Sequence, residues 1–388
     1  IGNGDYRRAG RAGGDAMIVK IGDVISEYSV RNKFDENIPV YSVTNEKGFC
    51  TGYFSKEVAS KDKSTYKIVP RGYFAYNPSR INVGSVDWQK YEDRVIVSPL
   101  YVVFGVSDRL ARQYLLHYLK SDMMLSFIKE YATGSVRDNL KLADLGKFPI
   151  NLRPVEEQRQ IAATLDKIDE LIAKRRQQLD KLDELVKSRF IEMFGDINVN
   201  DKGWTIQPLG ELCTIVRGGS PRPIEKFLGG DVPWIKIGDA TDGESIYLHS
   251  TKEHIIREGV SKSRMVKAGS LIFANCGVSL GFARIITFDG CIHDGWLAME
   301  DIDARLDKVF LLQALNQMTE HFRKIAPAGT QPNLNTAIMK AYKQIIPPMK
   351  LQKDFISFVE QTDKSKYRQE KYIGFFQCLE KSIRQEWL

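Results

Sequence analysis

The chain has 388 residues, which is long enough for two or more domains with cores of their own. Its 43% hydrophobic and 27% charged residues are ordinary for a globular protein, and no apolar run reaches the length of a membrane span. We therefore expect a cytoplasmic protein without a signal peptide, whose five scattered cysteines stay reduced. The net charge of +7 permits a nucleic-acid partner but is equally typical of a basic protein without one.

The first segments along the chain are an extension and a module of short strands. Residues 1–16 are rich in glycine and arginine and have no apolar period, so we treat them as a tag or a disordered extension. Residues 17–151 are predicted to form the first module. Strand patterns recur there, for example at Tyr73–Tyr76 and Tyr101–Phe104, and a helix is expected to begin near Asp108.

A long central helix is predicted over residues 152–195. Pro154 suits its first turn, and Gly195 suits the position just after its end. Apolar residues alternate at spacings of four and three, which is the seam of a coiled coil. We expect the seam to pair with a second helix through Leu165, Ile168, Ile172, Leu179, Leu182 and Val186. A helix of this length spans roughly 60 Å, so we interpret it as a spacer.

The second module, residues 196–346, is predicted to repeat the element order of the first. We expect a helix over Phe310–Ile325. The predicted strands are Pro233–Ile237, Leu271–Ala274 and Phe282–Thr287. A loop at Gly218–Pro223 has no counterpart in the first module.

The chain ends in a second long helix, residues 347–388. Its seam is interrupted by polar residues, and the positions expected to face the central helix are Val359, Ile373, Phe376 and Ile383. Two helices with matching seams in one chain should pair with each other. Since each helix follows its own module, antiparallel pairing is the natural result.

The second half of the sequence repeats the first. Gly84 falls on Gly281 and Gln158 on Gln352, and an alignment with one insertion puts Asn77 on Asn275. The predicted fold class is therefore α+β, with two pseudo-twofold-related α/β modules separated by two long helices that form an antiparallel coiled coil. Such an arrangement suits a roughly twofold target, of which duplex DNA is the commonest.

A catalytic centre is not evident in the sequence. There is no phosphate-binding loop and no dinucleotide-binding glycine pattern. Cys291, His293 and Asp294 form the nearest approach to a metal cluster, but a buried strand end with a satisfied histidine is more typical of this pattern. Asn77–Arg80 resembles the Asn-Pro-Pro-aromatic loop of DNA amino-methyltransferases, but it lacks the second proline and the aromatic residue, and we interpret it as a turn. We predict no catalytic, cofactor-binding or metal-binding residues in this chain.

Polar loops near glycines point more clearly to nucleic acid. Arginine reads guanine edges, asparagine reads adenine, and serine, threonine and lysine bind phosphates, while glycine lets the backbone come close to the duplex. The candidate DNA-binding residues are Asn77, Arg80, Asn82, Arg137, Arg217, Ser220, Arg222, Lys236, Asn275, Thr330 and Asn333. The alternative, that these are ordinary polar turns, stays open.

Four stretches carry a family resemblance. Leu152–Ile161 and Leu182–Asp196 resemble the central region of type I restriction–modification specificity subunits. Gly218–Pro221 together with Pro233–Asp239 resembles the start of a target-recognition domain in that family. Residues 347–388 match the family pattern poorly.

The resemblance implies a non-catalytic subunit that reads a split, asymmetric DNA site with two target-recognition domains. It implies two methyltransferase subunits docked on the chain, and restriction subunits with helicase and nuclease activity that join for cleavage. S-adenosylmethionine, ATP and magnesium would be bound by those partners, and no cofactor by this chain.

Two alternatives remain open on the sequence alone. The chain could serve a fused methyltransferase–nuclease system, which differs only in the partner. It could also be a coiled-coil scaffold that binds protein and no nucleic acid. Salt-dependent binding of duplex DNA by the assembled complex separates the scaffold from the DNA-reading hypotheses.

Overall fold

A computed structural model describes residues 17–52, 62–133, 139–240, 246–277, 279–327 and 333–388. The predicted extension and the candidates Arg137 and Thr330 lie outside these residues. The chain divides into two compact units. Unit 1 holds the residues up to Arg175 together with Tyr372–Leu388, and unit 2 holds Arg176–Lys371.

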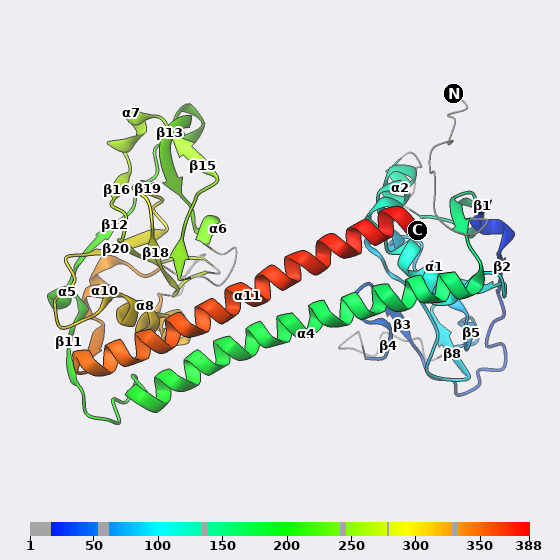
Figure 1. The fold of residues 1–388 in the computed structure, drawn as a ribbon, viewed down its shortest axis with the longest axis horizontal. Coiled ribbons are helices and arrows are strands. Elements are labelled where there is room, and N and C mark those ends of the chain that lie inside the picture. Colours follow the sequence, from blue (N-terminus) through cyan, green and yellow to red (C-terminus); the bar gives the residue numbers. More distant parts are fainter. Residues whose placement is uncertain (1–16, 53–61, 134–138, 241–245, 278, 328–332) are drawn as a thin grey trace. The chain divides into compact units, whose positions relative to one another are not determined.

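The module of unit 1 is built on an antiparallel four-stranded sheet. Its strand order is β2 (Ile25–Glu27), β9 (Val102–Val106), β6 (Phe74–Tyr76) and β7 (Val86–Trp88). Three strand pairs flank it: β1 (Met17–Lys20) with β10 (Pro149–Leu152), β3 (Ser42–Thr44) with β4 (Gly48–Cys50), and β5 (Lys67–Pro70) with β8 (Arg94–Val97). Its helices are α1 (Arg112–Leu119), α2 (Asp122–Thr133) and α3 (Leu142–Leu145), with single 3-10 turns at Ile21–Asp23 and Ile81–Val83 (Figure 1).

The core of unit 1 forms where α1 covers this sheet. Phe74 and Phe104 stack with ring centroids 5.1 Å apart, and both are fully buried. Tyr114 and Tyr118 of α1 pack into the same cluster. Alternate residues of short strands can supply such a face, because neighbouring side chains of a strand point to opposite sides.

The module of unit 2 contains one five-stranded and one four-stranded sheet. One has the order β12 (Thr214–Arg217), β20 (Trp296–Glu300), β17 (Leu271–Ala274), β18 (Ala283–Ile286) and β14 (Tyr247–Leu248). The other has the order β15 (Glu253–Ile255), β13 (Leu228–Ile235), β19 (Gly290–Ile292) and β16 (Arg264–Val266). A separate pair joins β11 (Thr205–Pro208) to β21 (Lys343–Ile346). The helices are α5 (Leu209–Leu212), α6 (Ile237–Ala240), α7 (Arg257–Val260), α8 (Lys308–Gln317), α9 (Thr319–Ile325) and α10 (Thr336–Ala341), with a 3-10 turn at Ile224–Lys226.

The two modules share one topology, which confirms the predicted duplication. The order β2–β9–β6–β7 in unit 1 recurs as β12–β20–β17–β18 in unit 2, and the pair β1–β10 recurs as β11–β21. Gly84 and Gly281 both take a left-handed backbone conformation, with φ of 84° and 98°, which favours glycine. The same local geometry is therefore encoded twice.

One detail of the sequence alignment is wrong. The Leu140 N–H donates to the Pro78 carbonyl at 3.2 Å, and the Leu334 N–H donates to the Asn275 carbonyl at 2.8 Å. Pro78, and not Asn77, is therefore the counterpart of Asn275. The sequence alignment had placed Asn77 on Asn275 because the two residues are identical, and this required one inserted residue. The paired strands contain no such insertion.

A buried glutamine joins each module to the long helix that follows it. Gln158 is fully buried; its Oε1 accepts the Ala111 N–H at 2.8 Å, and its Nε2 donates to the carbonyls of Arg109 (2.9 Å) and Arg153 (2.7 Å). In unit 2 the same three bonds are made by Gln352, which accepts from the Asp307 N–H at 2.8 Å and donates to the carbonyls of Arg305 (2.8 Å) and Pro347 (2.7 Å). The paired glutamines in the sequence thus have one structural role.

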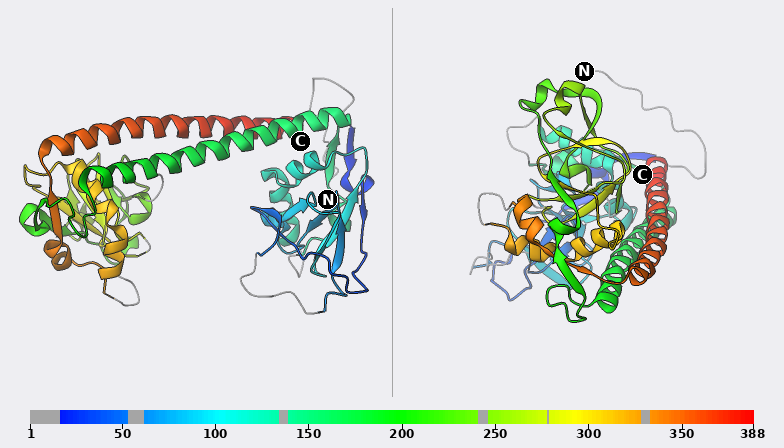
Figure 2. Two further views of the ribbon diagram at one scale, coloured as in Figure 1. Left: turned by 90° about the horizontal axis from the view of Figure 1, so that it is seen from below. Right: turned by 90° about the vertical axis from the view of Figure 1, so that its left-hand side faces the viewer.

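The long helices are α4 (Val155–Phe194) and α11 (Met349–Trp387). In unit 1, Leu165 near the start of α4 packs in one cluster with Trp387 at the end of α11. In unit 2, Phe190 near the end of α4 contacts Phe355 near the start of α11, with ring centroids 5.4 Å apart. The start of each helix meets the end of the other, so the coiled coil is antiparallel, as predicted (Figures 1 and 2).

The predicted seam positions are buried or half-buried. Leu165, Ile168, Ile172, Val186 and Val359 are buried, and Leu179, Leu182, Ile373, Phe376 and Ile383 are half-buried. Polar residues within the seam are paired. Lys366 forms an ion pair with Asp183, and the Arg175 guanidinium lies 4.9 Å from the centre of the Tyr372 ring.

Two helices differ from their predicted limits. The helix expected from Phe310 to Ile325 is broken at Met318 into α8 and α9, where the Thr319 hydroxyl donates to the carbonyls of Gly281 (2.8 Å) and Asn316 (2.9 Å). The helix expected near Asp108 begins at Arg112, because the backbone of Ala111 is extended, with φ of −68° and ψ of 128°.

Candidate nucleic-acid interface

A turn in unit 2 gathers candidates from separate parts of the sequence. Residues 293–295 connect β19 to β20, and Asp294 lies at the centre of the turn. Arg217 Nε donates to the Asp294 carbonyl at 3.1 Å, and Ser220 Oγ donates to Asp294 Oδ1 at 2.9 Å. Arg222 Nη2 lies 3.5 Å from Asp294 Oδ2. Three predicted DNA-binding residues therefore meet at Asp294, Arg217 at its backbone carbonyl and Ser220 and Arg222 at its carboxylate. The sequence had not marked Asp294 as part of the interface.

Two glycines explain how the loop after β12 comes so close to this turn. A Cβ added to Gly218 would lie 2.1 Å from the His293 carbonyl oxygen, so a side chain does not fit there. The Gly218 N–H donates to the Trp296 carbonyl at 2.9 Å, and the Gly219 N–H donates to the Ile292 carbonyl at 3.0 Å. Ser220 and Arg222 are thereby fixed next to Asp294.

Lys236 belongs to the same region through aromatic contacts. Its Nζ lies 5.8 Å from the centre of the Trp234 ring, and that ring lies 5.5 Å from the His293 ring. Lys236 also forms an ion pair with Glu253. The cations Arg217, Arg222 and Lys236 thus lie around the same turn, where they can attract an anionic partner.

His293 holds the turn in place. Its Nδ1 accepts the Gly295 N–H at 2.9 Å, which requires an unprotonated nitrogen. Burial is the main cause that lowers the pKa of His293, and the nearby cations Lys236, Arg222 and Arg217 lower it further, while Asp294 opposes them. The neutral imidazole therefore predominates near neutral pH. Although His293 Nδ1 also lies 2.9 Å from Asp294 Oδ1, we assign the hydrogen bond to the Gly295 amide.

The two candidate asparagines lie beside the turn and not on its surface. Asn275 is fully buried, and its backbone N–H donates to the Gly295 carbonyl at 3.0 Å. Asn333 is half-buried and bridges to Cys276. Within the described residues, both amide atoms of Asn275 and the Oδ1 of Asn333 lack a hydrogen-bond partner. DNA contact by these residues stays a prediction, and for Asn275 its burial does not favour it.

In unit 1, Asn77 and Arg80 line a cleft of about 370 Å³. Asn77 Oδ1 accepts the Ser79 N–H at 3.1 Å and the Ser79 hydroxyl at 2.9 Å, so the segment forms the expected turn. Arg80 is exposed, and Asn82 is half-buried in the 3-10 turn that follows. The hairpin of β3 and β4 forms the opposite wall with residues 42–47, which sequence reasoning had not selected.

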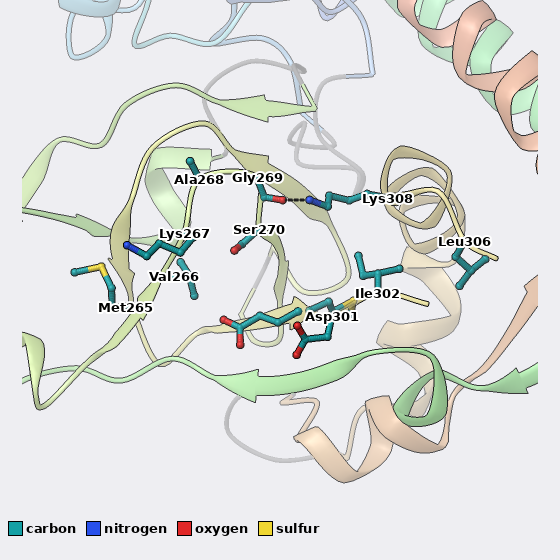
Figure 3. A pocket seen from close by; sticks show the side chains of 12 residues that line it. Met265, Val266, Lys267, Ala268, Gly269, Ser270, Asp301, Ile302, Leu306 and Lys308 are labelled. Atoms are coloured by element: carbon teal, nitrogen blue, oxygen red, sulfur yellow. Dashed lines mark hydrogen bonds between the residues drawn. The ribbon is translucent and has the colours of Figure 1, made fainter. Parts of the chain in front are cut away.

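Another hollow of unit 2 shares no residues with the Asp294 turn. It has a volume of about 610 Å³ and lies between β16, β17 and the start of α8 (Figure 3). Its lysines are engaged: Lys267 pairs with Asp289 at 2.7 Å, and Lys308 donates to the Gly269 carbonyl. Glu300 and Asp301 also line this hollow, and their carboxylates repel a phosphate.

Two features are absent from the described residues. These residues contain no group of three or more histidine, cysteine, aspartate or glutamate side chains placed to hold a metal ion. No helix among them has the length and apolar character needed to cross a membrane.

Comparison with known families decides the family. The sequence matches the type I restriction modification DNA specificity domain twice, over residues 14–184 and 201–373. The chain belongs to this specificity-domain family. The two matches coincide with the two copies of the fold.

Relatives of the specificity-domain family cover much of the chain. The type I restriction enzyme MjaIX specificity subunit of Methanocaldococcus jannaschii is 23% identical over 274 residues, which are 65% of this chain and 62% of that protein. A Haemophilus influenzae protein assigned to the same subunit class is 26% identical over 280 residues, 67% of this chain and 66% of that protein. The matches thus span slightly less than two thirds of these relatives' lengths.

Solved structures agree in fold. A chain from a study of complex assembly and conformational transition in a type I restriction–modification system has a TM-score of 0.60 and 18% identity, with 96% of this chain and 97% of that chain covered. The type I S subunit of M. genitalium has a TM-score of 0.55 and 15% identity, with 96% of each chain covered.

Proposed function

We propose that this chain is the DNA sequence-specificity subunit of a type I restriction–modification complex. Each module would read one half of a split, asymmetric DNA site, and the paired helices would set the gap between the halves. The observation that carries the proposal is the convergence of Arg217, Ser220 and Arg222 on the turn at Asp294. Guanidinium groups and hydroxyls are the side chains that contact guanine edges and phosphates.

The proposal assigns catalysis to the partners. Two methyltransferase subunits would bind S-adenosylmethionine, and restriction subunits with helicase and nuclease activity would bind ATP and magnesium. This chain would bind none of these cofactors, and it would act in the cytoplasm, where these partners and the DNA are found. Purified alone, it should neither methylate nor cut DNA.

Reconstitution tests the proposal. The chain is combined with the methyltransferase subunit of its own system and labelled S-adenosylmethionine, and methylation is mapped by sequencing modified bases. We expect methylation of one split sequence, lost when either protein is omitted. Methylation that does not depend on this chain, or DNA binding without salt dependence, would contradict the proposal.

A matched pair of arginine variants locates the contact. The side chains of Arg222 and Arg257 are 80% and 83% exposed, and each pairs with one aspartate, Asp294 and Asp231 respectively. We expect Arg222→Ala to weaken duplex binding by the complex about 5- to 150-fold, the range of one lost base contact. Arg257→Ala should leave binding unchanged. Equal effects of the two substitutions would place the interface elsewhere.

A further inference from the structure

We propose that the carboxylate of Asp294 reads the exocyclic amino group of a DNA base in the major groove. The inference rests on the proposed function and deepens it, because it assigns a specificity-determining residue that the sequence had not selected. The class of group recognised is the amino group of cytosine or adenine.

The two oxygens of this carboxylate are in different situations. Oδ1 is held by the Ser220 hydroxyl at 2.9 Å. Within the described part of the chain, Oδ2 is contacted only by Arg222, at 3.5 Å, and the Arg222 side chain is 80% exposed. A long, exposed ion pair contributes little and exchanges readily. With 33% of the side chain exposed, Oδ2 keeps acceptor capacity for a donor from outside the protein.

The backbone that carries Asp294 is fixed on both sides. The His293 N–H donates to the Ile235 carbonyl at 3.0 Å, and the Trp296 N–H donates to the His293 carbonyl at 2.9 Å. A Cβ added to Gly295 would lie 2.7 Å from Ile237 Cδ1, so the turn packs tightly against α6. A group held this firmly loses little freedom on binding and can discriminate between small differences in a ligand.

The charge of Asp294 limits what it can bind on DNA. Its cationic neighbours Arg217 and Arg222 draw the phosphates of a duplex toward this surface. Phosphates repel a carboxylate, and dehydrating a carboxylate without supplying a donor is costly. The major-groove donors of the base pairs are the N4 amino group of cytosine and the N6 amino group of adenine. A base amino group is therefore the partner that can replace the water molecules lost from the carboxylate.

A simpler role would be that of a counter-ion that orders the arginines. The two roles differ in their consequences. Removing a counter-ion removes repulsion at every DNA sequence, so binding should strengthen uniformly. Removing a base-reading acceptor should alter preference at one base pair and leave the others unchanged.

The test uses the complex of this chain with its methyltransferase subunit. The wild-type chain is measured first, and a failure to methylate a specific sequence would count against the proposed function and not against the role of Asp294. Asp294→Asn keeps the size of the side chain, and Asp231→Asn removes another exposed carboxylate of the same unit as a control. Motifs are mapped by sequencing modified bases.

Duplexes that lack single amino groups then identify the base. At each cytosine or unmethylated adenine of the half-site read by residues 196–346, 2-pyrimidinone replaces cytosine or purine replaces adenine. At one position, we expect the loss of the base amino group to weaken DNA binding by the wild-type complex about 5- to 150-fold. The same loss should have little effect on DNA binding by the Asp294→Asn complex. The base at the position where only the wild-type complex is sensitive identifies the group read by Asp294 as the amino group of cytosine or of adenine. The Asp231→Asn complex should behave as wild type.

Two results would overturn the proposal. One is an unchanged motif with uniformly stronger binding by the Asp294→Asn complex, which identifies a counter-ion. The other is equal sensitivity of the wild-type and variant complexes to every amino deletion. Ser220→Ala, which frees Oδ1 but keeps the charge, provides a second variant should Asp294→Asn fold poorly. It should reduce discrimination at the same base pair and at no other.

Discussion

Replacing Gln352 by methionine should loosen unit 2 selectively. The substitution keeps the length of the side chain but removes its amide. The Asp307 N–H and the carbonyls of Arg305 and Pro347 then lose the partner that they share in the structure. Gln352 itself is fully buried, so water cannot replace the amide without opening the site.

The size of the effect follows from the lost hydrogen bonds. Leaving a buried donor or acceptor without a partner costs about 1–3 kcal/mol for each group. With three groups affected and some offset from the apolar methionine, we expect about 2–4 kcal/mol less stability for this region. At about 1.4 kcal/mol for each factor of ten, local opening should become roughly 30- to 1,000-fold more frequent.

Hydrogen exchange followed by mass spectrometry is the suitable assay, because a chain of two units need not unfold in one step. We expect faster exchange at Asp307 and along α8, with unit 1 unchanged. Gln158→Met should give the mirror result, with faster exchange at Ala111 and along α1. Gln361→Met, at an exposed position of α11, is the control. Unchanged exchange in Gln352→Met, or equal loosening of both units, would refute the view that each glutamine fastens its own module.

Three further predictions concern the helices and the turn. Lys366 is mostly buried beside Asp183 and lies 3.9 Å from Asp363. Asp183→Leu alone should therefore lower the thermal stability of unit 2 more than Asp183→Leu combined with Lys366→Met and Asp363→Asn, which removes all three charges. Calorimetry of the wild-type protein and the two variants decides this. The pKa of His293 is lowered on folding, so the stability that its neutral form provides is present above the ordinary histidine pKa and is lost as the pH falls. After correction for the intrinsic pH dependence of exchange, protection of the Gly295 amide should decrease from about pH 7 to about pH 5, and His293→Asn should flatten this dependence. Deleting one heptad from each helix, Lys174–Asp180 and Arg368–Gly374, shortens the helix pair by roughly 10 Å, which corresponds to about three base pairs. In a methylation assay on duplexes of different gap length, this deletion should abolish methylation at the parental gap. Full activity at that gap would show that the helices do not set the spacing.

The sequence was informative where local pattern determines structure. The alternating apolar spacing of α4 located its seam, and the repeated Gly84 and Gln158 indicated the duplicated fold, because both residues meet local backbone requirements that the second copy also has. Single-residue correspondence was less secure. Asn77 and Asn275 are the same residue type, but structural equivalence is defined by strand pairing, which makes Pro78 the counterpart of Asn275.

The candidate interface was predictable only in part. Arg217, Ser220 and Arg222 lie close together in sequence, and the glycines of their loop were expected to let the backbone approach a duplex. In the structure these glycines let the loop approach another element of the chain. That element, the turn at Asp294, lies far along the chain. Its residues had been considered as a metal cluster because cysteine, histidine and aspartate occur together there. Only the pairing of β12 with β20 shows that the turn and the loop meet.

The most direct test of the account is an exchange of one module. Residues 17–151 are replaced by the corresponding module of a relative that directs methylation of a different sequence, and the modified bases produced by the reconstituted complex are sequenced. The account predicts that one half of the split sequence changes to that of the relative, while the other half and the gap stay as they were. A change in both halves, or in neither, would contradict the claim that each module reads its own half of the site.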